Sequence, residues 1–189
     1  MKAVIFDLGS VLVDYDGRDT LLGLSELAAV PLETIYNFNL PTEHAFGTGQ
    51  LSGHGYYDLL RESFGLSASY ETFALTVCRN QQRNEGALDF ARALQAQEDV
   101  EVGIISNTNE IHAHWLHANL PELEHFSSVI LSNEVGVLKP DPAIYELALS
   151  QLNVPAEHAL FVDDLAENIA GATVVGLSGY HHTDWQLTR

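Results

Sequence analysis

The sequence predicts an α/β fold: a parallel sheet with helices on both faces and a small helical cap inserted after the first strand. Two observations lead to this prediction. Short apolar runs that end in small or polar residues alternate with helical patterns of about ten residues, which is typical of parallel βαβ units. A stretch with no convincing strand follows the first apolar run directly, and it contains several helical patterns instead.

Four apolar runs have the length and composition of buried strands, and a fifth is expected near the end of the chain. These runs are residues 3–8, 101–105, 128–132 and 159–162, with the fifth opening at Val174-Val175-Gly176-Leu177. Helical periods between them cover 85–97, 109–118 and 141–152. The last helix begins at Asp141-Pro142, a favourable N-cap and first-turn pair.

The strand-free stretch predicts a helical cap over residues 17–84, inserted into an α/β core made of 1–16 and 85–189. Its helices are expected at 19–29, 31–39, 52–64 and 69–82, broken by Pro31, Pro41, the Gly47–Gly55 region and Gly65. An insertion at this point would cover the carboxyl end of the first strand. The loop over residues 46–50 contains two glycines, so it is the cap segment expected to approach a ligand closely.

Composition excludes several classes of partner. The net charge is −18 and only eight residues are Lys or Arg, which argues against nucleic acid and against an anionic membrane surface. No apolar run approaches the roughly 20 residues of a membrane span, and the acid at Asp7 interrupts any signal-peptide core. The lone Cys78 fits a reducing, cytoplasmic compartment. The sequence indicates no particular oligomeric state.

Polar residues follow four of the predicted strands. Asp7 follows the first, Ser106 and Asn107 the second, Lys139 comes after the third, and the pair 163–164 (Asp-Asp) follows the fourth. Ligands of open parallel sheets bind outside the carboxyl ends of the strands, so these side chains are expected to converge.

The chemistry of this set points to phosphoryl transfer. Gathered carboxylates repel one another and need a cation, and hard oxygen ligands select Mg²⁺. Lys139 and Ser106 suit phosphate oxygens. Asp7 can then act as a nucleophile that forms an aspartyl-phosphate, which water hydrolyses.

Four segments in order resemble the haloacid dehalogenase-like hydrolase superfamily, and the resemblance covers essentially the whole chain. They are Phe6-Asp7-Leu8-Gly9-Ser10-Val11-Leu12, Ile104-Ile105-Ser106-Asn107, Lys139-Pro140-Asp141-Pro142-Ala143-Ile144-Tyr145 and Phe161-Val162-Asp163-Asp164. The run Ser106-Asn107-Thr108-Asn109-Glu110-Ile111-His112 is similar to the branch of sugar-phosphate phosphatases with a small helical cap.

The resemblance implies a Rossmann-like core and roles for individual residues. Asp7 would be the nucleophile, and Ser106, Asn107 and Lys139 would bind the substrate. Asp7, the Gly9 carbonyl, Asp163 and Asp164 would hold Mg²⁺. The expected substrate is a small phosphorylated metabolite, with sugar phosphates favoured by the branch that the chain resembles.

Gly9 departs from the family pattern. Phosphatases of this family usually carry a second Asp at this position, which protonates the leaving group. Glycine keeps the backbone carbonyl but loses the proton donor, a loss worth about 10²–10⁴-fold in rate. We expect Asp14, Asp16 or a water to take that role.

Two other functions stay open. A 2-haloacid dehalogenase also uses an aspartate nucleophile, but it needs no metal and replaces the Asp-Asp pair that this chain retains. A degenerate protein that binds a phosphorylated ligand without turnover is the second alternative. His112, His114 and His117 resemble a metal cluster, but their offsets of two and five do not place all three on one helix face, so a solvated helix face is the expected outcome.

Overall fold

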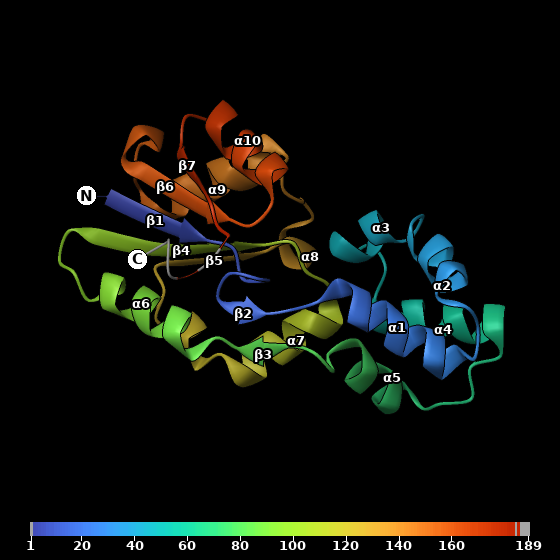
Figure 1. The fold of residues 1–189 in the computed structure, drawn as a ribbon. Coiled ribbons are helices and arrows are strands. Elements are labelled where there is room, and N and C mark those ends of the chain that lie inside the picture. Colours follow the sequence, from blue (N-terminus) through green and yellow to red (C-terminus); the bar gives the residue numbers. More distant parts are fainter. Residues whose placement is uncertain (1, 184, 186–189) are drawn as a thin grey trace.

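The computed structural model describes residues 2–183 and residue 185. Its centre is a five-stranded parallel sheet in the order β5-β4-β1-β6-β7 (Figure 1). The strands are β1 (Lys2–Phe6), β4 (Val100–Ser106), β5 (Ser128–Leu131), β6 (Ala159–Asp163) and β7 (Ser178–His181). Since β1 is central, the loops that follow β1, β4 and β6 open side by side at one edge, and the predicted parallel α/β fold is confirmed.

Helices cover both faces of this sheet, because successive residues of a strand point to opposite faces. Phe6 packs in one buried cluster with α6 (Glu85–Gln95) and α7 (Glu110–Asn119), whereas Ile5 packs in another with α9 (Pro142–Leu152) and α10 (Ala166–Val174). Figure 1 shows the two pairs of helices on opposite sides of the strands. Two short 3-10 turns complete the core, η1 (Pro121–Glu124) and η2 (Ala156–His158).

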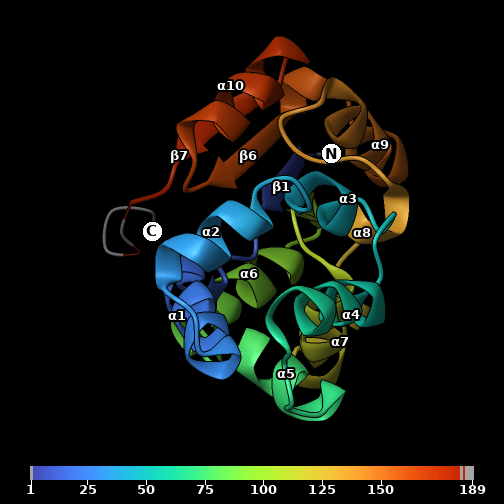
Figure 2. The same cartoon turned by 90° about the vertical axis from the view of Figure 1, so that its right-hand side faces the viewer.

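Five helices between β1 and α6 form a body beyond the carboxyl ends of the strands (Figures 1 and 2). They are α1 (Gly17–Ala28), α2 (Leu32–Asn39), α3 (Glu43–Gly47), α4 (Gly53–Phe64) and α5 (Tyr70–Val77). They share a buried apolar cluster of their own, to which α7 contributes Ile111. This body is called the cap below, and its exact limits at residues 17 and 84 stay a prediction.

The two chain segments that join the cap to the core lie side by side. The outgoing segment contains β2 (Val13–Asp14) and the returning segment contains β3 (Gln82–Arg83), and the two strands pair antiparallel. The short ribbon fixes the position from which α1 starts. A two-residue strand gives no periodic signal, so the sequence did not predict it.

The fifth strand was predicted too early in the chain. Val174 closes α10, and the chain turns through Gly176 at φ +97° before β7 begins at Ser178. The apolar pair at 174–175 therefore belongs to a helix end. The prediction failed because a short apolar run does not distinguish a strand from a turn of helix. The sequence also placed the end of α5 too late, since Cys78 closes that helix.

Two short helices were not predicted. α3 occupies part of the glycine-containing stretch that was read as a loop, and α8 (Ser132–Val135) directly follows β5. Gly136 closes α8 at φ +76°, in the left-handed region that favours glycine. Both helices are too short to show a helical period, and they lie where the cap meets the core, since α3 contacts α8.

The lengths of the described helices can be compared with the length that a membrane span needs. The longest described helices, α1 and α4, have 12 residues each, whereas a span needs about 20. In the part of the chain that the structure describes, no helix has the length and apolarity that crossing a bilayer requires.

Candidate active site

A compact turn after β1 presents the candidate nucleophile. The Asp7 amide donates to the Val162 carbonyl of β6 at 2.9 Å, which fixes the end of the strand. The Leu8 carbonyl then accepts the amides of Leu12 and Val13, each at 2.8 Å. Ser10 adopts φ +58° at the tip of this turn. The backbone therefore folds back on itself within one turn and leaves the Asp7 side chain at the carboxyl end of β1.

A buried ammonium joins two of the predicted carboxylates. Lys139 Nζ lies 2.7 Å from Asp7 Oδ1 and 2.7 Å from Asp163 Oδ2. Asp7, Lys139 and Asp163 are only 8%, 4% and 0% exposed. The three residues come from the ends of β1, the segment before α9 and the end of β6. The sheet order thus brings together groups that are up to 156 positions apart in sequence, as the sequence predicted.

Burial and mutual charge set the protonation of this cluster. Burial, reinforced by the Asp163 charge, raises the pKa of Asp7 to about 6 although Lys139 opposes the shift. Burial by itself lowers the pKa of Lys139, but Asp7 and Asp163 outweigh it and the net shift is upward. Lys139 therefore stays charged at neutral pH, and Asp7 is ionised there at an electrostatic cost.

Asp163 is held by a set of neutral donors. The Leu165 amide donates to its Oδ1 at 2.8 Å, and Asn168 Nδ2 lies 3.0 and 3.1 Å from its two oxygens. The Tyr145 hydroxyl in turn donates to the Asn168 carbonyl at 2.8 Å. Asn168 therefore braces the loop that follows β6. A carboxylate held from several sides keeps one orientation, which is what a ligand or a charge partner needs.

The carboxylate set fits a divalent cation. Among the described residues, Asp7, Asp163 and Asp164 form the one group of metal-ligating type, with an oxygen from each within 4.8 Å of the others. Three carboxylates and one ammonium leave two negative charges, which one divalent ion would neutralise. Burial, reinforced by Asp163, also raises the pKa of Asp164. All candidate ligands are oxygens, the donors that Mg²⁺ prefers.

The end of β4 lies against Lys139. Ser106 is buried at the end of the strand. The Asn107 amide group donates to the Lys139 carbonyl at 2.9 Å and accepts the Lys139 amide at 2.8 Å. Asn107 therefore holds the backbone of the lysine, and this bracing occupies both ends of the side-chain amide that was expected to bind substrate. The peptide bond between Lys139 and Pro140 is cis.

Comparison with known proteins agrees with this arrangement. The sequence profile of the haloacid dehalogenase-like hydrolases matches residues 1–176. The sesquiterpene phosphatase astK of Aspergillus oryzae is 32% identical over 187 residues, which cover 97% of this chain and 90% of that protein. The D-ribitol-5-phosphate phosphatase of Bacteroides thetaiotaomicron is 26% identical, with 98% and 95% covered.

A solved structure from Bacteroides thetaiotaomicron is similar over its whole length. It is a HAD family enzyme in complex with magnesium and inorganic phosphate, and it superposes with a TM-score of 0.86 at 25% identity, covering 100% of both chains. The chain belongs to the haloacid dehalogenase-like hydrolases. It is thus a hydrolase with named phosphatases among its relatives, and its Rossmann-like core is that of the family.

The departure of this hydrolase from its family at Gly9 has a structural counterpart. A Cβ placed on Gly9 would have the Tyr15 ring as its nearest neighbour, at 3.8 Å. The ring packs edge-on against His112 with 5.3 Å between centroids. Where the family usually has a carboxylate, the site thus has an aromatic wall.

Asp14 and Asp16 both have structural partners. Asp14 is exposed on β2 and accepts from Asn84 Nδ2 at 3.0 Å. Asp16 caps α1 by accepting the Arg18 amide at 2.9 Å. Neither residue lines the cavity beside the catalytic cluster. These contacts favour a water over either carboxylate as the replacement for the missing acid.

A cavity of about 710 Å³ lies between the cap and the carboxyl ends of the strands. Its lining reaches the catalytic cluster through three neighbours, since Asn107 follows Ser106, Leu138 precedes Lys139 and Leu165 follows Asp164. From the stretch at 46–50 that was expected to approach a ligand, Phe46 and Gly47 line the cavity. The cavity therefore adjoins the cluster of Asp7, Lys139 and Asp163.

The histidines of α7 do not form a cluster. His112 is buried, and its Nε2 donates to the Val77 carbonyl at 3.2 Å while its Nδ1 lies 3.3 Å from the Asn109 amide nitrogen. His117 is exposed and contacts Glu134 at 3.3 Å. In the described residues, the carboxylates around Asp7 are the one metal-ligating group of three or more. The expected solvated helix face is found for His114 and His117, but it is wrong for His112, which is buried against the end of α5.

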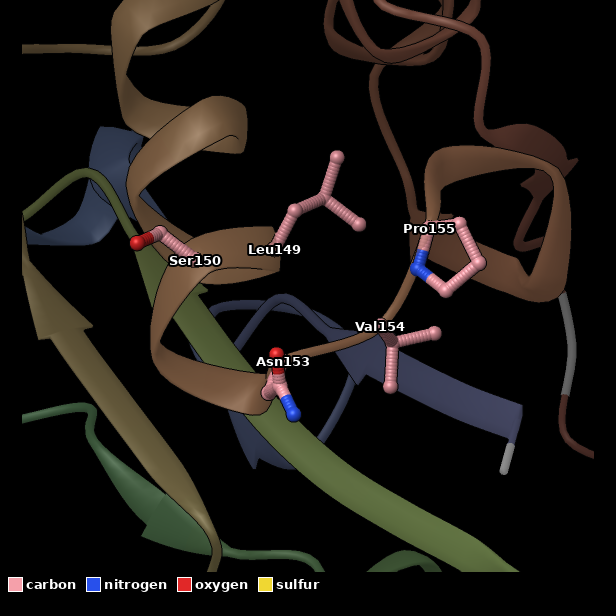
Figure 3. Close-up of a pocket in the computed structure, with 5 residues that line it drawn as sticks. All are labelled: Leu149, Ser150, Asn153, Val154 and Pro155. Carbon is pink, nitrogen blue, oxygen red and sulfur yellow. The ribbon is translucent and has the colours of Figure 1, made fainter.

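A second hollow lies at the other end of the sheet. About 380 Å³ of open space borders the end of α9 and the segment before β6 (Figure 3). It is lined by uncharged residues: Leu149, Ser150, Asn153, Val154 and Pro155. The hollow lies near the amino end of β6, whereas Asp163 lies at the carboxyl end. It therefore has no part in the site around Asp7.

Several residues of the site were not found from the sequence. Ser132 is buried at the start of α8, where its hydroxyl accepts the Thr108 amide at 2.9 Å and donates to the Gly47 carbonyl of the cap at 2.7 Å. Tyr15, Leu40 and Leu165 line the cavity from separate segments. Each is a single residue in a short loop or at a helix end, so no periodic pattern or motif marks it.

Proposed function

We propose that this hydrolase is a magnesium-dependent phosphatase that cleaves small phosphate monoesters through an aspartyl-phosphate at Asp7. The observation that supports this most is the contact of one buried ammonium, Lys139 Nζ, with both Asp7 and Asp163 at 2.7 Å. A cation between a nucleophile and a fixed carboxylate suits the binding of a phosphate group that must be attacked at phosphorus.

In the proposed reaction, a carboxylate oxygen of Asp7 forms a bond to phosphorus as the bond between phosphorus and the ester oxygen breaks. The alcohol leaves, and Lys139 stabilises the charge on the transferring phosphoryl oxygens. Water then attacks phosphorus, which releases inorganic phosphate and restores the Asp7 carboxylate. Ser106 is proposed to hold a further phosphate oxygen.

Asp7, Asp163, Asp164 and the Gly9 carbonyl would hold the Mg²⁺ ion. When bound, the ion would neutralise the excess negative charge of the carboxylates and of the phosphate oxygens. Asp7 then becomes easier to ionise, because a nearby cation lowers the pKa of a carboxyl group. The relative with a bound magnesium ion and phosphate supports this choice of metal.

The leaving alcohol needs a proton that Gly9 cannot supply. We assign that proton to a water at the mouth of the site. The absence of a positioned acid slows the cleavage of poor leaving groups by about 10²–10⁴-fold relative to a site that has one. Activated esters and acyl phosphates lose least, because their leaving groups need no proton.

The resemblance to small-cap phosphatases suggested sugar phosphates, and the likeness to a D-ribitol-5-phosphate phosphatase supports that choice. The likeness to a sesquiterpene phosphatase supports an apolar alcohol instead. A sugar phosphate and the phosphate of an apolar alcohol are both small phosphorylated compounds, and nothing in the site suggests nucleic acid. The cytoplasmic location that the lone Cys78 indicates remains a prediction.

Turnover of acetyl phosphate and p-nitrophenyl phosphate by the purified protein tests the proposal. We expect phosphate release with Mg²⁺ and loss of it with EDTA. Asp7→Ala should lower kcat by at least about 10³-fold, because it removes the carboxylate that is proposed to attack phosphorus. The matched control is Asp99→Ala, which should behave as wild type. Asp99 is exposed and directly precedes β4, at the amino ends of the strands.

The two alternatives give different results in the same assay. A haloacid dehalogenase would release chloride from chloroacetate in the presence of EDTA. A protein that only binds phosphorylated ligands would turn over no substrate and still bind inorganic phosphate. Retained turnover in Asp7→Ala would falsify the assignment of the nucleophile.

A further inference from the structure

The cavity beside the catalytic cluster carries no cationic side chain of lysine or arginine. Twenty described residues line it, and none of them is Lys or Arg. Two are acids, Glu43 and Glu167, and both are exposed. A second phosphate or a carboxylate on the substrate would therefore meet negative charge and no ion-pair partner. The ligand that fits carries its charge on the one phosphate that Lys139 binds.

The exposed residues that line this cavity include two leucines, which stand beside polar side chains such as Glu43 and Glu167. Leu40 at the end of α2 and Leu165 beside Asp164 both line it, and they are 50% and 48% exposed. Deeper in the cavity, Phe46 and Tyr56 stack with 4.8 Å between ring centroids. Exposed leucines that share one opening leave apolar surface in water, and an apolar ligand would cover it.

Several polar side chains of the lining already have partners. The Tyr56 hydroxyl donates to Asn39 Oδ1 at 3.0 Å, and the Thr20 hydroxyl lies 3.3 Å from the Val77 carbonyl. His112 and Asn107 are held as described above. A polyol needs donors and acceptors for each hydroxyl that it buries, since an unpaired buried hydroxyl costs free energy. The polar groups that the lining has committed elsewhere do not provide them.

The ring of Tyr15 extends the lining of the cavity as far as Gly9. Tyr15 lines the cavity and is the nearest neighbour of the position where a Gly9 side chain would begin. A carboxylate at that position would face the leaving oxygen with a charge, whereas the ring presents carbon. The volume of about 710 Å³ falls within the range of roughly 300–1,000 Å³ for pockets of drug-sized ligands.

We propose that the substrate of this hydrolase is the monophosphate of an uncharged, largely apolar alcohol, whose carbon skeleton fills the cavity under the cap. The proposal rests on the phosphatase function proposed above and names the substrate class of that site. It departs from the sugar-phosphate expectation, and it predicts that the cap selects by apolar contact and by the absence of cations.

A series of monoalkyl phosphates, from ethyl to decyl phosphate, tests it directly below the concentrations at which they form micelles. Each buried methylene contributes about 0.8 kcal/mol, so kcat/KM should rise about two- to fourfold per methylene until the chain fills the cavity. Ribitol 5-phosphate and fructose 1,6-bisphosphate should be poorer substrates than decyl phosphate by at least about tenfold. Acetyl phosphate serves as the reference that does not depend on the cavity.

Two variants of the cap sharpen the test. Leu40→Lys places a cation at the cavity mouth and should lower the ratio of kcat/KM for decyl phosphate to that for acetyl phosphate about tenfold, while it improves the bisphosphate. Leu75→Lys is the matched control, because Leu75 is 71% exposed on α5 and does not line the cavity. It should leave all the ratios unchanged.

The outcomes separate the two proposals. Turnover of acetyl phosphate together with a flat chain-length series, or with a preference for polyol phosphates, overturns the apolar substrate and leaves the phosphatase function intact. No turnover of any ester in the presence of Mg²⁺ overturns both. A rising series that Leu40→Lys flattens and Leu75→Lys does not supports the proposed substrate class.

Discussion

The cluster of Asp7, Lys139 and Asp163 is a network of buried charges, whereas the adjoining cavity has no buried ion pair in the described part of its lining. Asp7, Lys139 and Asp163 form a buried network in which every group has an ionic partner. The cavity under the cap has leucines and aromatic rings in its walls and no lysine or arginine among its described lining residues. The proposed function thus assigns the chemistry and the selectivity of this enzyme to different parts of the chain. Changes in the cluster should affect every substrate, and changes in the cavity should affect the choice among substrates.

Lys139→Met is the strongest way to break the cluster. The variant leaves Asp7 and Asp163 buried without their cation, which should cost about 3–5 kcal/mol of unfolding free energy. Turnover of every phosphate ester should fall by at least about 10²–10³-fold, because a cation at the phosphoryl oxygens is lost. Urea unfolding in EDTA and acetyl phosphate kinetics measure the two effects.

The chain offers a matched control in its other lysine. Lys2 is exposed at the start of β1, so Lys2→Met should leave stability and kinetics within a few tenths of a kcal/mol and about twofold. Equal losses in the two variants would mean that the ammonium of Lys139 has no special place in the site.

Gly9→Asp tests whether the site lacks a proton donor at Gly9, where the Tyr15 ring lies between the cluster and the cavity. The new Cβ would lie 3.8 Å from Tyr15, an ordinary contact, so the variant should fold. It should raise kcat for alkyl phosphates by about 10²-fold through general acid catalysis, and it should change kcat for acetyl phosphate little. Gly9→Asn has the same shape without the proton and should show no gain. A gain of equal size in both variants would contradict the role of the proton.

Asp7→Asn sharpens the comparison through stability. Because the pKa of Asp7 is raised to about 6 in the folded protein, the folded state holds a proton that the unfolded state releases near pH 4. This stabilisation is lost as pH rises through 6. In EDTA, Asp7→Asn should therefore be more stable than wild type above pH 6, by on the order of 2–3 kcal/mol, and equal to it below pH 4. Thermal unfolding between pH 4 and 8 measures the difference.

The result for Asp7→Asn depends on burial, so an exposed aspartate is its control. Asp99→Asn should show no such pH-dependent gain. A variant at Asp7 that is less stable than wild type at pH 8 would show that the Lys139 contact outweighs the cost of burying the carboxylate.

Ser132→Ala should have the smallest effect, at the contact between the two regions. It leaves the Thr108 amide and the Gly47 carbonyl without the hydroxyl that joins them, which should cost about 1–3 kcal/mol. We expect a lower melting temperature and a higher KM for alkyl phosphates, with little change in kcat. Ser150→Ala, at an exposed serine of α9, is the control and should match wild type in both measurements.

The sequence predicted the cluster far better than the cavity, for a physical reason. Asp7, Lys139 and Asp163 each follow an apolar run or stand in a short motif, and the parallel sheet brings the ends of such runs together. The cavity is built from single residues such as Tyr15, Leu40 and Leu165, which come from a turn, a helix end and a loop. Their convergence depends on how five short helices pack, and no local pattern encodes that.

The errors in secondary structure have a similar cause. The pair at 174–175 lies at the end of α10, where Val175 packs against the core and Val174 is exposed, and nothing in four residues distinguishes this from a strand. Asn107 was expected to contact the substrate, which stays a prediction, and its amide holds the Lys139 backbone from both sides. A side-chain amide next to a motif residue serves either role, so only the fold shows which group it meets.

The indole of Trp185 offers a reporter for the turn that carries Asp7. Its Nε1 donates to the Val11 carbonyl at 2.7 Å, and its ring packs against Phe6 with 6.3 Å between centroids. The chain has two tryptophans, so Trp115→Phe leaves this indole as the single source of tryptophan fluorescence. Emission from such a variant should follow rearrangements of the turn on phosphate binding, in real time and without an attached dye.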